Sequence, residues 1–201
     1  RHNAQKLSGH IGKVIRLTPE GGIPADNPFI GKPGALPEIW SYGHRNIQGA
    51  AIHPESGRLW TIEHGPRGGD EINIPAAGVN HGWPVVTHGI EYSGGTIGDG
   101  LKTKPGMAAP IHIWTPVIAP GGMTFYSGNL FPAWKGNLLI GGLRAGALVR
   151  LELEGDRVVR EERLLRQIGD RIRDVAVGPD GAVYAITDSG DGKILRITPA
   201  Q

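Results

Sequence analysis

The sequence contains no cysteine among its 201 residues. Disulfide bonds, zinc–thiolate sites and a thiol nucleophile are therefore excluded. Long apolar runs are also missing, because none approaches the ~20 residues that a membrane-spanning helix needs, and no span is expected. Net charge is low, since 21 lysines and arginines nearly balance 19 aspartates and glutamates to give +2. This balance argues against a nucleic-acid-binding protein, which normally gathers basic residues on one face.

Glycine and proline, by contrast, are abundant. The 33 glycines and 16 prolines make up about 24% of the chain, roughly double the usual ~12%. Apolar residues, at 39%, are interleaved throughout the sequence. This composition predicts a folded chain with many turns rather than a disordered one.

Strand patterns dominate the sequence. Short runs rich in Val, Ile and Leu alternate with polar residues and stop at Gly, Pro, Asp or Ser. Hairpin turns are expected at residues 53–57 and 178–181, where glycine supplies the positive φ that tight turns need. Residues 152–167 have the charge density of a helix, but Gly155 and Asp156 interrupt them, so two strands around a turn are expected there.

The hairpins belong to a repeat that ends in a third strand of the form Gly-x-apolar-apolar-Arg-apolar. This form occurs at residues 12–17, 146–151 and 192–197, and residues 70–74 take the same place in another unit. A repeat of roughly 40–50 residues with three or four strands is typical of a β-propeller blade, and about four such units fit here. A β-sandwich is the alternative, and it explains the density of strands but not their recurrence.

Three polar clusters fall in loops or at strand ends, where propeller sites are built. The first, residues 43–49, contains Arg45, Asn46 and Gln48, which can bind a carboxylate or a polarised oxygen. The second, residues 63–71, has glycines that allow backbone carbonyls to approach a ligand such as Ca²⁺. Each has a plainer alternative, a polar loop that caps a strand in the first case and an ordinary irregular turn in the second.

The third cluster is basic and combines Arg144 with residues 170–174. In an extended segment Arg171 and Arg173 point to one face, so a further arginine beside them would make a pocket for a polyanion. A solvated strand face with Asp170 and Asp174 as ion-pair partners is the alternative. Asp188, at the end of a neighbouring predicted strand, is a further candidate polar group.

Together these stretches resemble the soluble pyrroloquinoline-quinone (PQQ) dependent glucose and aldose sugar dehydrogenases. The motifs Gly-His-Arg-Asn-x-Gln-Gly and Arg-x-Arg-Asp-Val are specific in combination. The matching stretches run nearly end to end, at residues 10–17, 23–28, 43–49, 63–73, 80–84, 143–144 and 171–175. The resemblance implies a six-bladed β-propeller, of which residues 1–201 would form one partial domain of about three to four blades with the N-terminal blades absent.

PQQ, the cofactor that the resemblance implies, is an ortho-quinone with three carboxylates. By position, Arg144, Arg171 and Arg173 would bind its carboxylates and oxygens. Asn46, Gln48 and Asp188 would complete the polar shell. Arg144 stands where the best-known glucose-oxidising branch has a lysine, and a carboxylate accepts either side chain with a different geometry.

Calcium is the second cofactor that the resemblance implies. The backbone carbonyls of Gly65 and Pro66 would hold the Ca²⁺ that also binds PQQ. Glu71 and the backbone near His81 match a second, structural Ca²⁺ site of family members. The same branch has glutamine in place of His64 and tyrosine in place of His81. Both histidines could be metal ligands, but isolated histidines are more often hydrogen-bonded scaffold.

The implied reaction is oxidation of an aldose at C1 to its lactone, with hydride transfer to PQQ and electrons passed on to an acceptor. Arg45 would stabilise the negative charge that develops on the quinone oxygen, and Trp114 would form part of the sugar wall. The family's general base, a histidine paired with an aspartate, lies upstream of the stretch matched by residues 10–17. Neither His2 nor His10 occupies that position, and we expect a chain that opens at Arg1 without an apolar leader to be processed or to begin partway through a longer protein.

Two other functions remain open from the residues. A propeller that acts only as a binding or interaction module would have no affinity for quinones. A calcium-dependent lactonase would need a cage of Glu, Asn and Asp side chains, whereas the second cluster offers mainly carbonyls. The open edges of a partial propeller predict self-association or retention of the missing N-terminal segment, and the resemblance implies a periplasmic or secreted protein.

Overall fold

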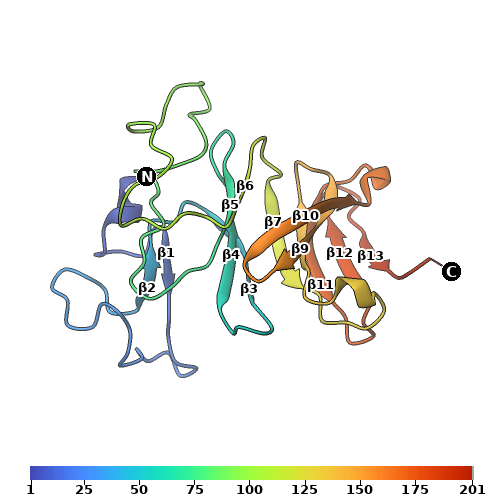
Figure 1. Ribbon diagram of the computed structural model, residues 1–201, viewed down its shortest axis with the longest axis horizontal. Coiled ribbons are helices and arrows are strands. Elements are labelled where there is room, and N and C mark those ends of the chain that lie inside the picture. The colour runs from blue at the N-terminus through green and yellow to red at the C-terminus, as the bar shows by residue number, and fades with distance from the viewer. Residues whose placement is uncertain (201) are drawn as a thin grey trace. The chain divides into compact units, whose positions relative to one another are not determined.

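The computed structural model describes residues 1–200 and is all-β apart from three single-turn 3₁₀ helices (Figure 1). In chain order the elements are η1 (His2–Gln5), β1 (Lys13–Ile15), β2 (Ile39–Tyr42), β3 (Ile47–Ile52), β4 (Leu59–Glu63), β5 (Asp70–Asn73), β6 (His112–Trp114), β7 (Pro120–Phe125), η2 (Pro132–Trp134), β8 (Leu138–Gly142), β9 (Ala147–Glu154), β10 (Arg157–Leu164), η3 (Arg166–Ile168), β11 (Ile172–Val177), β12 (Val183–Thr187) and β13 (Ile194–Ile197). No helix among residues 1–200 has the length and hydropathy of a membrane span.

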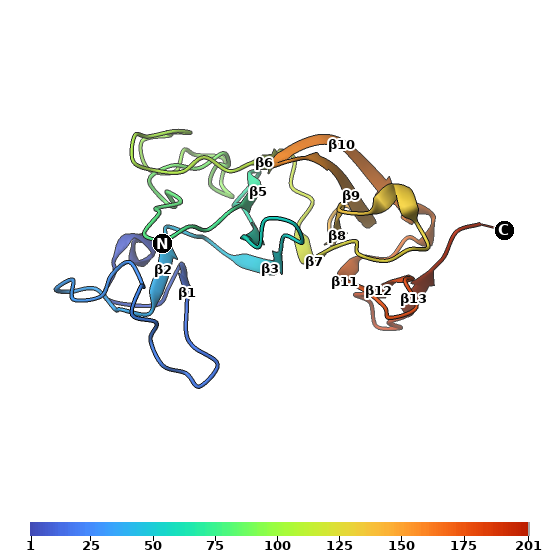
Figure 2. The same cartoon turned by 60° about the horizontal axis from the view of Figure 1, so that its bottom comes forward.

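The strands form four sheets, in the orders β1-β2, β3-β4-β5-β6, β10-β9-β8-β7 and β11-β12-β13. Both expected hairpins are confirmed as β3-β4 and β11-β12, with Gly57 and Gly181 at positive φ in their turns. Residues 152–167 are likewise two strands, because β9 and β10 pair antiparallel around Gly155 in the long hairpin of Figures 1 and 2.

The recurrent third strand is found in three sheets. Residues 70–74, 146–151 and 192–197 contribute β5, β9 and β13, each the third strand of its sheet in chain order. Residues 12–17 form a shorter strand than expected, because β1 ends at Ile15, where its pairing with β2 shifts register. The number of blades and the closure of a ring remain predictions.

The chain divides into two compact units. Unit 1 comprises Arg1–Ile47 with Glu63–Pro116, and unit 2 comprises Gln48–Ile62 with Val117–Gln201. The expectation of one partial domain over residues 1–201 remains a prediction, and each unit is described by itself.

Unit 2 has a core in which β8 is buried along its whole length. β7 and β9 flank β8 in its sheet, and β11 packs against it. Tyr126, Leu139, Leu148, Val175 and Val183 form a buried hydrophobic cluster. Burying apolar side chains of this size stabilises the fold by about 1.5–3 kcal/mol each.

Two glycines of unit 2 set how closely β11 approaches the sheet beside it. A Cβ on Gly121 in β7 would lie 1.9 Å from the carbonyl oxygen of Arg173, and one on Gly141 in β8 would lie 2.9 Å from that of Ile172. Any larger residue at either position would push β11 away. These glycines therefore fix the strand that carries Arg173.

In unit 1 the segment after β2 is hydrogen-bonded to the N-terminal residues. Gly43 N–H donates to the carbonyl of Ala4, and His44 N–H donates to the carbonyl of Gly12, each at 3.1 Å. A long loop runs from β5 to β6 (Figure 2) and contains Trp83, whose N–H donates to the Gly43 carbonyl at 2.8 Å. This packing holds the first polar cluster in place.

Candidate functional site

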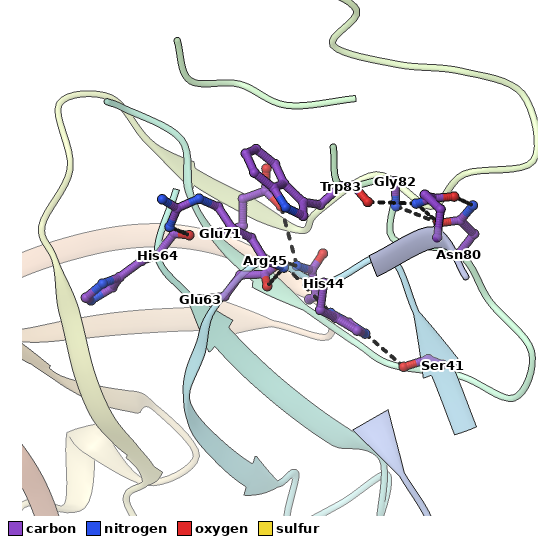
Figure 3. Close-up of polar contacts among 11 residues, drawn as sticks. Ser41, His44, Arg45, Glu63, His64, Glu71, Asn80, Gly82 and Trp83 are labelled. Carbon is purple, nitrogen blue, oxygen red and sulfur yellow. Dashed lines mark hydrogen bonds and ion pairs between the residues drawn. The ribbon is translucent and has the colours of Figure 1, made fainter. Parts of the chain in front are cut away.

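Arg45 is held on three sides in unit 1 (Figure 3). Its Nη1 donates to the carbonyl oxygen of His64 at 2.8 Å, and its Nη2 lies 3.4 Å from the Tyr92 hydroxyl. The guanidinium carbon lies 5.3 Å from the centre of the Trp83 ring. A guanidinium over an indole face is stabilised by about 0.5–2 kcal/mol, so this side chain is preorganised rather than free to sweep through solvent.

Glu63, the last residue of β4, anchors the backbone of Arg45. Its Oε2 accepts the Arg45 backbone N–H at 2.8 Å, and its Oε1 accepts Nδ2 of Asn73 at 3.0 Å. Only 3% of Glu63 is exposed. The first cluster is therefore tied to the start of the second.

Ser41, His44 and Glu63 follow one another in the arrangement of a hydrolase triad. Ser41 Oγ lies 2.8 Å from His44 Nε2, but His44 Nδ1 is 3.9 Å from Glu63 Oε1, beyond hydrogen-bond distance. Ser41 is fully buried, and the His44 ring stacks on that of His81 with 4.5 Å between centroids. A nucleophile needs access to its substrate, so this trio is scaffold.

The bend at Gly65 and Pro66 follows directly from β4. The Gly65 N–H donates to Asp70 Oδ1 at 2.9 Å, and a Cβ on Gly65 would lie 2.2 Å from the carbonyl oxygens of both Gly68 and Gly69. Only glycine fits such a crowded backbone. The bend therefore requires glycine at position 65, and its role as a calcium site rather than an ordinary irregular turn remains a prediction.

One pocket of unit 1 brings both clusters together. Its walls include Arg45, Glu63, His64, Gly65, Glu71, His81 and Trp83. Neither ring nitrogen of His81 has a hydrogen-bond partner among residues 1–200, although His81 is buried. Burial, with a smaller contribution from His44, lowers the pKa of His81 to about 3, so its ring is neutral.

Glu71 is, with Glu63, one of two acidic residues that line this pocket. Burial, reinforced by the nearby charges of Glu63 and Asp70, raises the pKa of Glu71 to about 8. No group of three or more His, Cys, Asp or Glu side chains suited to a metal occurs among residues 1–200. The oxygen donors of this pocket are therefore the carboxylates of Glu63 and Glu71 together with backbone carbonyls.

The raised pKa of Glu71 makes the metal-free protein less stable as pH rises from 6.5 to 8. In this window the folded state retains a proton that the unfolded state, with its ordinary glutamate pKa of 4.5, has released. The free energy of unfolding then falls by up to ~1.4 kcal/mol per pH unit. The lowered pKa of His81 changes the free energy of unfolding only below pH 6.5, the ordinary pKa of histidine. Urea unfolding at several pH values measures the slope, and Glu71→Gln should flatten it; an equal slope in both proteins would contradict the assignment.

In unit 2, Arg171 and Arg173 share one carboxylate oxygen. Both guanidiniums reach Oδ2 of Asp188, at 3.1 and 2.9 Å. The alternative that pairs them with Asp170 and Asp174 is wrong, because Asp170 binds Lys193 and Asp174 accepts the backbone N–H of Val175. Two positive charges thus face one negative charge on an exposed surface.

Arg144 is exposed in the turn between β8 and β9. A Cβ on Gly146 in that turn would lie 3.7 Å from the Asp170 carbonyl, so the turn runs beside the segment that leads to Arg171. Asn46 in unit 1 and Gln48 in unit 2 are also exposed. The predicted cofactor residues are therefore accessible in their own units, and their common ligand remains a prediction.

Trp114 differs from the expected sugar wall in its exposure. Only 4% of it is exposed, and its ring meets that of His112 edge to face with 4.3 Å between centroids. Its carbonyl accepts the N–H of Gly69. Trp114 therefore packs beside the second cluster and is hydrogen-bonded to it through Gly69. Contact with a sugar would require the buried Trp114 ring to become exposed.

Sequence reasoning gave no role to Glu63, Trp83 or Tyr92, although all three surround Arg45. Glu63 and Trp83 lie in stretches that carry the family resemblance, which was the available signal. Tyr92 lies outside those stretches, and nothing in its neighbourhood marks it.

Solved structures similar to this chain include sugar dehydrogenases. A glucose dehydrogenase is 51% identical with a TM-score of 0.96, over 100% of this chain and 58% of that one. The PQQ-bound form of an aldose sugar dehydrogenase from Streptomyces coelicolor is 28% identical with a TM-score of 0.74, over 96% of this chain and 53% of that one. These neighbours confirm the all-β sugar dehydrogenase fold over the β-sandwich.

The chain belongs to the Glucose / Sorbosone dehydrogenase family, whose sequence model matches residues 1–196. Among curated relatives, the aldose sugar dehydrogenase YliI of Escherichia coli K12 is 48% identical over 200 residues, which are 99% of this chain and 54% of that protein. The chain spans about half the length of the curated relatives it matches.

Proposed function

We propose that the protein to which this chain belongs oxidises aldose sugars at C1 to lactones, with PQQ and Ca²⁺ as cofactors. The observation that carries the proposal is the pocket in which Arg45 lies beside the Gly65-Pro66 bend, joined through the His64 carbonyl. A cation bound at this bend, together with the immobilised guanidinium of Arg45, would place two positive charges beside one developing oxyanion.

The bend suits calcium. Ca²⁺ binds carbonyl and carboxylate oxygens in flexible geometry, and the glycine at position 65 lets the backbone crowd together without a side chain. Glu71 suits a second cation, because a bound divalent ion would stabilise the ionised carboxylate against the burial and the repulsion from Glu63 and Asp70 that raise its pKa. The backbone carbonyls of Gly65 and Pro66 would therefore hold the calcium that also binds PQQ. Glu71 and the backbone near His81 would hold the second calcium.

The basic surface of unit 2 suits a polycarboxylate. Arg171 and Arg173 share Asp188, so an anionic ligand that approaches them meets a net positive charge. Guanidinium groups bind planar carboxylates through two parallel hydrogen bonds. Arg144 and Gln48, which belong to the same unit, would add further contacts to this ligand.

When bound, PQQ supplies the quinone that accepts a hydride from the sugar. Arg45 would donate a hydrogen bond where negative charge develops, and Trp83 would keep its guanidinium at that place. None of the residues of this pocket is assigned as the general base. In this proposal the base comes from the part of the protein that corresponds to the unmatched half of its relatives.

Reconstitution of the complete natural protein tests the proposal. We expect metal-free protein to bind PQQ tightly only with added Ca²⁺, by titration calorimetry, and then to reduce a redox dye when an aldose is supplied. Absence of both PQQ binding and dye reduction would overturn the proposal. PQQ-independent hydrolysis of a lactone would identify a lactonase. If the protein shows neither sugar oxidation nor lactone hydrolysis, the remaining function is that of a binding module.

The double variant Arg171→Ala, Arg173→Ala should weaken PQQ binding at least ~10-fold, because each charge-assisted contact contributes about 1.5–3 kcal/mol. The measurement is the dissociation constant by calorimetry. Arg157→Ala is the matched control, since Arg157 is an exposed arginine of the same unit that pairs with Glu154. An unchanged affinity in the double variant would remove both arginines from the cofactor site.

A further inference from the structure

Glu63 is a carboxylate that is almost fully buried. Among residues 1–200, its only ion-pair contact is with His44, at 3.9 Å. Burying a charge is costly unless hydrogen bonds satisfy it, and here the donors are the Arg45 backbone N–H and the Asn73 side-chain amide. Because burying this carboxylate is costly, we infer that the two hydrogen bonds it accepts have a structural role.

Three hydrogen bonds fasten residues 45–46 to residues 63–64. The Arg45 N–H donates to Glu63 Oε2 at 2.8 Å, the His64 N–H donates to the Asn46 carbonyl at 3.0 Å, and Arg45 Nη1 donates to the His64 carbonyl at 2.8 Å. Arg45 is thus held at its backbone and at its guanidinium by two consecutive residues (Figure 3).

The same two residues lead directly into the Gly65-Pro66 bend. Any displacement of the Arg45 backbone would therefore shift the guanidinium relative to that bend. Of the three hydrogen bonds, only the one to Glu63 has a side-chain acceptor. A substitution at Glu63 can therefore remove the contact that holds the Arg45 backbone. Asn73, from β5, in turn fixes the Glu63 carboxylate by its other oxygen.

We propose that Glu63 is a positioning residue that holds Arg45 in register with the Gly65-Pro66 bend. Its meaning for catalysis rests on the proposed function, whereas the anchoring itself does not. Glu63 does not touch the substrate or the cofactor in this proposal. It acts through Arg45, and Asn73 orients it.

Glu63→Gln is the test variant. A glutamine keeps the shape but has one oxygen for two donors, so its NH₂ group must face either the Arg45 N–H or the Asn73 amide. In the complete reconstituted protein, kcat should fall roughly 10–100-fold, the range that a misplaced catalytic group produces. KM for the aldose should change less than about twofold, because ground-state sugar binding is not altered.

Hydrogen–deuterium exchange of the Arg45 amide gives a readout that needs no cofactor. The amide should be protected in the wild-type protein and should exchange at least ~10-fold faster in Glu63→Gln, in line with loss of a hydrogen bond of about 1.5 kcal/mol or more to a charged group. Glu63→Asp, which retains the charge, should recover part of the protection and of kcat. Glu154→Gln, an exposed glutamate of unit 2, is the control.

Every result of the exchange and kinetic measurements supports or overturns the proposed role of Glu63. An Arg45 amide that is unprotected in the wild-type protein overturns the proposal even if Glu63→Gln does not fold. Unchanged exchange or unchanged kcat in a folded Glu63→Gln also overturns it. If the wild-type protein neither binds PQQ nor oxidises sugars, the proposed function fails, while the exchange experiment still decides whether Glu63 anchors Arg45.

Discussion

Arg45→Lys should lower kcat for aldose oxidation about 100-fold or more, while PQQ affinity changes little. Loss of one preorganised donor to a developing oxyanion costs about 10²–10³ in rate. A lysine retains the charge but loses the planar fork that lies over Trp83 and reaches the His64 carbonyl at 2.8 Å. Steady-state kinetics with a redox dye measures the rate, and calorimetry measures cofactor binding.

Arg58→Lys is the control for this experiment. Arg58 is an exposed arginine of unit 2 that pairs with Asp156, outside the candidate site. Wild-type kcat in Arg45→Lys would show that Arg45 does not stabilise the reacting oxygen. A parallel loss of PQQ affinity would instead place Arg45 among the groups that bind the cofactor in its ground state.

Gly65→Ala should abolish reconstitution at micromolar PQQ and calcium. The added Cβ would lie 2.2 Å from two backbone carbonyl oxygens, and backbone atoms cannot rotate away as a flexible side chain can. Relieving such a clash costs about 1–3 kcal/mol, occasionally more, and moves the carbonyls that would hold calcium. We therefore expect calcium affinity, measured by calorimetry, to fall more than about 10-fold.

Gly95→Ala is the matched glycine control, because a Cβ at Gly95 would meet no heavy atom within 4 Å. It should bind calcium and PQQ like the wild-type protein. If Gly65→Ala also did so, the bend would not be the calcium site. Thermal unfolding of both variants separates a local change in metal binding from loss of the fold.

The strands and hairpins of this protein follow from local chemistry. Glycine at positions 57, 155 and 181 takes the positive φ of a turn, and the strands on either side alternate apolar and polar residues. The repeat of a third strand at β5, β9 and β13 is visible for the same reason. Such features depend on neighbours in the sequence and need no knowledge of the rest of the chain.

Partners within the site could not be predicted in the same way. The sequence offered Asp170 and Asp174 as alternative ion-pair partners of Arg171 and Arg173, because they are close to these arginines in the chain. The structure pairs both arginines with Asp188, because the end of β12 lies beside them in the sheet. Side-chain partners are set by strand register, which a single sequence does not contain.

The sequence by itself determined the all-β class, the hairpins and the motifs that place the chain among the sugar dehydrogenases. Only the tertiary structure decided that Glu63, His64 and Trp83 enclose Arg45 and that Trp114 is buried. The physical reason is that turns and strands are governed by short-range backbone preferences. Burial and hydrogen-bond partners, in contrast, arise when segments distant in the chain pack together and exclude water.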